Sequence, residues 1–313
     1  MELSLIYLPL GTPEKKLGVV SVQSFSKNSY TDYHLNILKN IAIYTSIALE
    51  NTGTYSQIKQ QHSQIKSSVN YARTIQNSIL PSQKELDKLF NNFILYRPKD
   101  IVSGDFYWLS EVGNMIFVAV VDCTGHGVPG AFMSMIGSRL LSEIVNEKKI
   151  RETDEILEAL NIGVKKALHQ EQTDNTDGMD VCLCKIEKNE LGAEISFTGA
   201  KNPLFIYQND KSDLIRIRGD KKAIGGNHFQ KMSFTQTKLS LKKGDMIYLT
   251  TDGFVDQNNE IRKKITTPKL MTLLNQIQEK PLPVQKEILE NELTTWQGKE
   301  EQRDDITILG IKI

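Results

Sequence analysis

Residues 101–137 read IVSGDFYWLSEVGNMIFVAVVDCTGHGVPGAFMSMIG, and this stretch decides the fold. It contains two apolar runs, each next to an aspartate, separated by a segment whose glycine and asparagine indicate a tight turn. A two-residue loop that begins at Val112 would place Asp105 opposite Val120 in a hairpin. Asp122 would then lie one pleat further along on the same face, because side chains alternate with period two. The hairpin alone therefore predicts two carboxylates at one edge of a sheet.

Two further acidic sites lie late in the chain. Asp252 and Gly253 follow the apolar run DMIYLT, and Asp304 and Asp305 precede the apolar run ITILGI. If these runs pair as antiparallel strands, the end of one meets the start of the other, and Asp252 shares an edge with Asp304. Each acid taken singly is more typical of a turn or a solvated strand end. Their order and edge placement, taken together, favour a common site.

Clustered carboxylates repel one another unless a cation neutralises them or some of them take up protons. Oxygen ligands without a set of histidines and cysteines favour Mg²⁺ or Mn²⁺. The four aspartates of the two pairs therefore predict a site for two such ions. A site of this kind is typical of hydrolysis by a metal-activated hydroxide at a phosphoryl group.

Composition bounds the class of protein. The 313 residues include 38 Lys and Arg and 38 Asp and Glu, so the formal net charge is zero. This balance argues against a general nucleic-acid binder or a protein of anionic membrane surfaces. Three cysteines without a ligand-like histidine and cysteine array indicate a reducing compartment, and Cys182 and Cys184 are expected on one face of a strand. With neither a membrane-length apolar run nor a leader pattern, we expect a cytoplasmic protein.

The chain is expected to have three parts. Residues 1–52 contain two strand-like runs and an amphipathic helix, and residues 53–80 form a polar helix that Pro81 ends. Residues 81–313 predict one α+β domain in which antiparallel sheets carry helices on their outer faces, because strands outnumber helices and the helices come in consecutive pairs. Strands are expected at 92–96, 105–110, 115–122, 178–187, 194–199, 203–207, 232–239, 245–250 and 306–311, and helices at 131–146, 153–170, 268–278 and 284–295.

The helix at 53–80 carries a weak heptad stripe. Ile58, Ile65, Ala72 and Ile79 are spaced by sevens. This spacing favours a two-stranded coiled coil, and hence a homodimer whose helix passes a signal to the main domain. A solvated linker helix with one apolar stripe is the other interpretation.

Several separated motifs resemble the metal-dependent serine/threonine protein phosphatases, most closely the bacterial stage II sporulation protein E-type branch. They are SGDFYW, VVDCTGHGVPGAFMS, TTDGFVDQ and DDITILGI, and the fragments NYARTIQNSILPS, GMDVCLCKIE, FTGAKNPLFIY and KKAIGGNH fit the same branch. The resemblance covers residues 70–313. It implies a four-layer α-β-β-α sandwich of two antiparallel sheets flanked by helices, with two Mn²⁺ or Mg²⁺ ions at one end.

The resemblance also implies roles for individual residues. Asp122 would bridge both metals, and the backbone carbonyl of Cys123 would be a further ligand. Asp252 and Asp304 would hold the second metal, and Asp105 would lie near the first, directly or through water.

Three further residues are secondary candidates. Asp305 would support the site by hydrogen bonding, and Gly253 follows a metal-binding aspartate. His126 could be the general acid, but it lies further from Asp122 than the histidine of the eukaryotic-type relatives, so a turn-stabilising imidazole is an equal interpretation.

The chain departs from the branch at Lys201, where many relatives have a histidine, and this could alter substrate contact. Arg97 and Lys99 could bind the substrate phosphate, although a solvated strand end is the more typical role for such residues.

The first part resembles the last third of a GAF domain, with GVVSVQS leading to a helix that contains IALEN. It could be a truncated ligand-sensing domain, a segment that packs on a partner, or a small appendage.

The function that the resemblance implies is a metal-dependent phosphatase. It would hydrolyse phosphoserine or phosphothreonine on a phosphorylated regulatory protein such as an anti-sigma-factor antagonist. The alternative is a non-catalytic regulatory module that docks a phosphoprotein and reports through the helix at 53–80.

Overall fold

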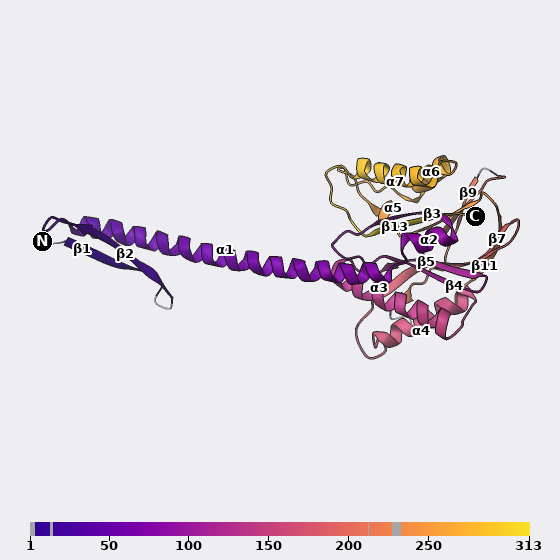
Figure 1. Ribbon diagram of the computed structural model, residues 1–313, viewed down its shortest axis with the longest axis horizontal. Helices are drawn as coiled ribbons and strands as arrows, with labels where there is room; N and C mark the ends of the chain where they lie inside the picture. Colours follow the sequence, from indigo (N-terminus) through magenta and orange to yellow (C-terminus); the bar gives the residue numbers. More distant parts are fainter. Residues whose placement is uncertain (1–3, 13–14, 212, 227–232) are drawn as a thin grey trace. The chain divides into compact units, whose positions relative to one another are not determined.

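The computed structural model describes residues 4–12, 15–211, 213–226 and 233–313 (Figure 1). The chain divides into two compact units, residues 1–68 and 69–313. The first unit holds the antiparallel strands β1 (Ser4–Gly11) and β2 (Lys16–Ser24) and most of helix α1 (Asp32–Ile79). The predicted strands and helix are confirmed, while the likeness to a GAF domain remains a prediction.

Helix α1 is one unbroken helix of 48 residues, and the sequence boundary expected at 52 falls inside it (Figure 1). Its composition is polar overall. In the described part of the chain, no helix is both long and apolar enough to cross a membrane. The predicted boundaries of the three parts remain predictions.

The second unit is a sandwich of two antiparallel sheets. The strands of the first sheet are ordered β11 (Thr237–Lys242), β7 (Gly192–Ala200), β6 (Gly178–Lys188), β5 (Met115–Cys123) and β4 (Phe106–Val112), with β10 (Ile224–Gly225) also paired to β6. Those of the second are ordered β3 (Asn91–Arg97), β13 (Ile306–Lys312), β12 (Met246–Thr250), β8 (Leu204–Gln208) and β9 (Asp213–Ile217).

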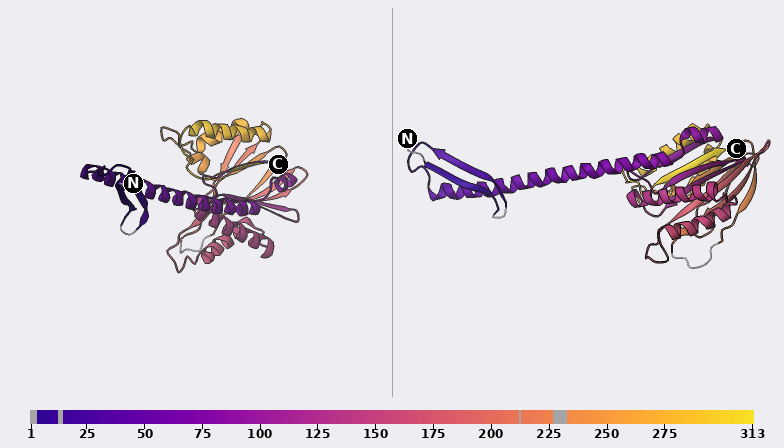
Figure 2. Two further views of the ribbon diagram at one scale, coloured as in Figure 1. Left: turned by 60° about the vertical axis from the view of Figure 1, so that its left-hand side comes forward. Right: turned by 60° about the horizontal axis from the view of Figure 1, so that its bottom comes forward.

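Helices cover both outer faces of this sandwich. Helices α3 (Gly127–Ser142) and α4 (Thr153–Ala167) lie on the first sheet, and α6 (Thr267–Ile277) and α7 (Leu282–Gln297) lie on the second. Figures 1 and 2 show the two pairs on opposite sides of the strands. Helix α2 (Gln83–Leu89) precedes β3, α5 (Gly253–Asp256) follows β12, and a π-helical turn, Glu143–Glu147, extends α3. The predicted four-layer α-β-β-α architecture is confirmed.

Strand β5 shows why the layers form. Phe117, Ala119 and Val121 pack against α3 and α4, whereas Val118 and Val120 face the other sheet. The strand is apolar on both faces because both are buried. Cys182 and Cys184 lie in the same inter-sheet core, as their alternation predicted.

The predicted register of the first hairpin was wrong by two residues. Val112 pairs with Met115, so the loop is Gly113 and Asn114, and Gly113 has a φ of 64°. A two-residue hairpin loop favours a glycine at its first position when that position needs positive φ. Since Phe106 pairs with Val121, Asp105 comes level with Asp122.

Other differences have local causes. Helix α3 begins at Gly127 and not at residue 131, because Pro129 lies in the first turn, where its missing N–H costs nothing. The strand expected at 232–239 is β11 at Thr237–Lys242, and Met232 lies outside the described residues. Strand β9 was not predicted from the sequence.

Candidate metal centre

Four aspartates meet at one end of the sandwich. Asp122 ends β5, Asp180 begins β6, Asp252 follows β12, and Asp304 precedes β13. All four line one cavity of about 370 Å³. Asp122 and Asp180 are direct partners in the ladder, and the pairing of Thr250 with Ile308 brings the other two acids to the same edge. The structure therefore brings together three of the four predicted acids and adds Asp180.

Asp105 is held behind this cavity. It is only 2% exposed, and its Oδ2 accepts hydrogen bonds from Thr251 Oγ1 at 2.7 Å and Thr307 Oγ1 at 2.8 Å. The Tyr96 hydroxyl donates to the backbone carbonyl of Asp105 at 3.2 Å. Asp105 is not among the described residues that line the cavity. Its carboxyl belongs to the floor of the site.

The acids raise one another's affinity for protons. Burial, and then the charge of Asp105, raises the pKa of Asp122 well above its ordinary value. Burial also raises the pKa of Asp252 and of Asp180. A divalent cation would relieve the same repulsion that protonation relieves.

Asp305 positions the loops next to the acids. It is 3% exposed, and its two carboxylate oxygens accept from the backbone N–H groups of Lys99 and Gly104, each at 2.7 Å. A Cβ on Gly104 would lie 2.4 Å from the Gly125 carbonyl oxygen and 3.3 Å from that of Cys123. Only glycine permits this approach, so the loop that presents the Cys123 carbonyl is tightly packed.

Gly253 is required for a similar reason. A Cβ at this position would stand 1.9 Å from the Asp305 carbonyl oxygen. The motif Thr-Asp-Gly therefore combines an acid at the cavity with a residue that lets two backbones touch.

The Cys123 thiol faces the core between the first sheet and its helices, and burial raises its pKa well above the ordinary value. A thiol in this setting stays protonated and is a poor nucleophile. Only the backbone of Cys123 is available to the cavity chemistry.

His126 lies between two neighbours from the loop before Gly104. Its Nδ1 is 2.6 Å from Asp100 Oδ2, and its Nε2 is 2.9 Å from Lys99 Nζ. The ring precedes α3 and is not among the residues that line the acidic cavity. Arg97 donates instead to Gln297, at 3.1 Å. The predicted roles of His126, Arg97 and Lys99 toward substrate remain predictions.

The donor set fits a hard divalent cation. Among the described residues, no three His, Cys, Asp or Glu side chains form a preformed cage for one ion. Mg²⁺ commonly keeps several waters and takes only one or two carboxylates from the protein, so an open acidic cavity suits it. Mn²⁺ accepts the same oxygen ligands.

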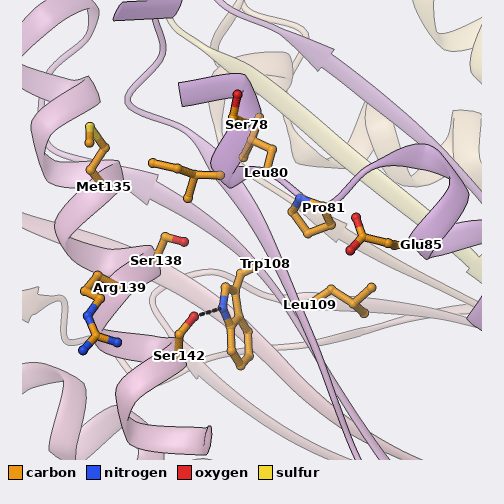
Figure 3. Close-up of a pocket in the computed structure, with 11 residues that line it drawn as sticks. Ser78, Leu80, Pro81, Glu85, Trp108, Leu109, Met135, Ser138, Arg139 and Ser142 are labelled. Atoms are coloured by element: carbon orange, nitrogen blue, oxygen red, sulfur yellow. Dashed lines mark hydrogen bonds between the residues drawn. The ribbon is translucent and has the colours of Figure 1, made fainter. Parts of the chain in front are cut away.

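A larger cavity of about 470 Å³ lies elsewhere, between α3, β4 and the end of α1 (Figure 3). Three of its polar side chains are already paired. Trp108 Nε1 donates to Ser142 at 2.9 Å, Arg139 bonds Glu147 at 2.8 Å, and Glu85 caps α2 through Ser82. Although this cavity is larger, it has no cluster of acids among the described residues that line it. The acidic cavity is therefore the candidate site.

Residues 113–313 match the family described as Stage II sporulation protein E. The SiaA-PP2C domain of Pseudomonas aeruginosa is similar in structure, with a TM-score of 0.72 and 31% identity over 81% of this chain and 98% of that domain. The chain belongs to the Stage II sporulation protein E family of PP2C-type phosphatases. The motifs at 103–108, 120–134, 250–257 and 304–311 predicted this membership.

One further relative is similar in sequence and another in fold. Phosphoserine phosphatase RsbU of Bacillus subtilis is 24% identical over 231 residues, which are 73% of this chain and 64% of RsbU. The chain therefore spans less than two thirds of the length of that curated relative. The PP2C phosphatase domain of SpoIIE from Bacillus subtilis superposes with a TM-score of 0.57 at 16% identity, over 71% of this chain and 62% of that chain.

Sequence reasoning missed Asp180 and the position of Lys201 beside it. The fragment GMDVCLCKIE carried the signal, because it places an acid at the start of a strand, as the other sites do. Its neighbour in space is decided by the pairing of β6 with β5, which the sequence does not show.

Proposed function

We propose that this chain is a phosphoprotein phosphatase that depends on two Mn²⁺ or Mg²⁺ ions. The observation that carries the proposal is the meeting of Asp122, Asp180, Asp252 and Asp304 in one cavity. Asp122, Asp252, Asp304 and the carbonyl of Cys123 would hold the ions. When bound, the ions would activate a water for attack and polarise the phosphoryl oxygen.

The remaining site residues would act through position. Asp105 would support the acidic cavity from its floor, since two threonine hydroxyls hold its carboxylate in place. Asp305 would hold the loop at 99–104 against the loop at 123–125. Cys123 would form no covalent phosphoenzyme, because its thiol is buried in the core.

We infer the substrate from the relatives. RsbU is described as a phosphoserine phosphatase, and the fold is shared with the RsbU and RsbW domains of Rv1364c from Mycobacterium tuberculosis at a TM-score of 0.56 and 20% identity. The proposed substrate is phosphoserine or phosphothreonine on a signalling regulator of the anti-sigma-factor antagonist type. The proposed compartment is the cytoplasm, supported by three free, buried cysteines.

We further propose that two copies of the chain pair through α1. Its apolar heptad residues Ile58, Ile65 and Ile79 are 57%, 65% and 41% exposed, which is unfavourable for isolated helices in water. A second α1 would cover them in a coiled coil. Light scattering should give a dimer for the wild type and a monomer for Ile58→Asn with Ile65→Asn, and a wild-type monomer would contradict the pairing.

The test of the activity is Mn²⁺-dependent release of phosphate from a phosphoserine peptide. Asp122→Asn should abolish it, because the substitution removes the charge of a carboxylate that would hold the ions. Asp210→Asn is the matched control, since this exposed aspartate pairs with Lys242 far from the cavity. If Asp122→Asn and wild type performed alike, the proposal would be wrong.

Calorimetric titration with Mn²⁺ separates this function from a non-catalytic docking module. A phosphatase of this design binds the ion at millimolar concentration or below, and Asp122→Asn weakens that binding. A docking module shows no binding in either protein.

A further inference from the structure

A second, smaller cavity adjoins the acidic one. It encloses about 200 Å³, and Asp180, Lys201 and Asp252 line both cavities. The volume corresponds to about seven water molecules, which is room for one side chain and not for a folded element. A substrate segment whose phosphorylated residue enters the acidic cavity would thus bring a neighbouring side chain to this second cavity.

The wall between the two cavities is firmly held. Lys201 adopts a φ of 56°, and its N–H donates to the Asp220 carbonyl at 2.7 Å. The side-chain amide of Asn202 donates to the backbone carbonyl of Asp180 at 3.2 Å. Lys201 Nζ lies 3.1 Å from Asp180 Oδ1. The lysine charge is therefore already used within the wall, and it neutralises one acid there.

Arg216 provides the remaining cation in the second cavity. It lies on the edge strand β9, opposite Phe205, and its guanidinium carbon is 6.0 Å from the centre of the Phe205 ring. Within the described residues it makes no ion pair or hydrogen bond with an anion. Partial burial, and then the charge of Arg218, lowers the pKa of Arg216. Arg216 is exposed, and no carboxylate of the described residues is its partner.

The lining of this cavity is mixed: Phe205, Val255 and Leu270 are its apolar members besides Pro203, and the others are polar. A glutamate or aspartate side chain can satisfy both the apolar residues and the guanidinium of this cavity. Its methylene groups contact the apolar wall, and its two oxygens match the planar fork of a guanidinium.

We propose that the second cavity is a specificity subsite that binds an acidic side chain close in sequence to the phosphorylated residue, with Arg216 as its partner. The inference rests on the proposed function, because the acidic cavity must receive the phosphorylated residue. It narrows the substrate class to phosphoproteins with a glutamate or aspartate beside the phosphorylated position.

The test compares phosphoserine peptides that carry one glutamate at successive positions near the phosphoserine with twins that carry glutamine there. With Mn²⁺ present, the wild-type ratio of kcat/KM for the best glutamate peptide over its twin should be about two- to fivefold, the range of an exposed ion pair. Arg216→Gln should reduce this ratio to about one. Arg216→Glu should reverse it in favour of lysine peptides.

Arg218→Gln is the matched control. Arg218 lies two residues from Arg216, carries the same charge and does not line the cavity. The preference for the glutamate peptide should therefore remain in this variant. Loss of the ratio in both variants would show general electrostatics and overturn the proposal, as would a wild-type ratio near one or a ratio retained in Arg216→Gln.

Binding of the same peptides, followed by fluorescence anisotropy, distinguishes two kinds of failure. If neither peptide is hydrolysed, the proposed function fails, and the binding ratio of wild type against Arg216→Gln still decides the subsite. If both peptides are hydrolysed equally and bound equally, the phosphatase stands and the subsite is wrong.

Discussion

Replacing Thr251 with valine should damage the floor of the acidic cavity more than the same change at Thr307. Thr251 is 2% exposed and makes two hydrogen bonds through one hydroxyl. It donates to Asp105 Oδ2 at 2.7 Å and accepts from the backbone N–H of Thr307 at 3.0 Å. The hydroxyl of Thr307 donates only to the same Asp105 oxygen, at 2.8 Å.

The magnitudes follow from these contacts. Losing one hydroxyl bond to a buried carboxyl costs about 1–3 kcal/mol in the free energy of unfolding, and leaving a buried N–H unpaired costs about 1–3 kcal/mol more. Thr251→Val should therefore cost about 2–6 kcal/mol, and Thr307→Val about 1–3 kcal/mol. Valine keeps the shape of threonine, so cavity formation contributes little to either value.

The assay is urea denaturation followed by tryptophan fluorescence. Both tryptophans, Trp108 and Trp296, lie within the unit at 69–313, so the signal reports that unit alone. Equal costs for the two variants, or a cost below about 0.5 kcal/mol for Thr251→Val, would refute the hydrogen-bond reasoning.

Three other outcomes are expected. Without divalent ions, the free energy of unfolding should fall as the pH rises from about 4 to 7, because burial raises the pKa of Asp122 and Asp105 in the folded state and their protonated forms stabilise that state only at low pH. In denaturation curves at pH 7, Mn²⁺ should offset this loss of stability, and a flat pH profile without metal would contradict the prediction. Gly253→Ala should cost more than about 2 kcal/mol, because its Cβ would stand 1.9 Å from a carbonyl oxygen, and an unchanged melting temperature would show that the backbone adjusts freely. Gln76→Met should speed hydrogen exchange at the Ser103 amide, which donates to Gln76 Oε1 at 3.1 Å, and unchanged exchange would show that this bond contributes no protection.

The local pattern of the chain was sufficient for much of the architecture. Period-two alternation and turn residues predicted the hairpin of β4 and β5, and the structure adds that β5 is buried on both faces. The register of this hairpin was predicted wrongly because its turn residues allow two positions for the loop. Glycine at Gly113 suits either position of a two-residue loop, and only the ladder shows that it occupies the first.

The positions of these acids could also be predicted from the sequence, because each motif places an aspartate at a strand end next to a glycine or a turn. This determined Asp122, Asp252 and Asp304 as members of one site. It gave no sign that Asp105 is buried, because its place at a strand end looks the same in sequence as that of Asp122. Burial beneath Thr251 and Thr307 is a property of the other sheet, and those threonines are distant in the chain.

The sequence was sufficient to predict most of the strands and helices of the second unit and three of the four acids that line the cavity, since hydrophobic period and turn chemistry act between residues close along the chain. Which strand ends become neighbours depends on the order of the strands in the folded sheets. The pairing of β6 with β5 set Asp180 beside Asp122, and the pairing of β9 with β8 set Arg216 over Phe205 beside the second cavity. Strand order depends on the burial of whole faces against each other, which no local stretch encodes.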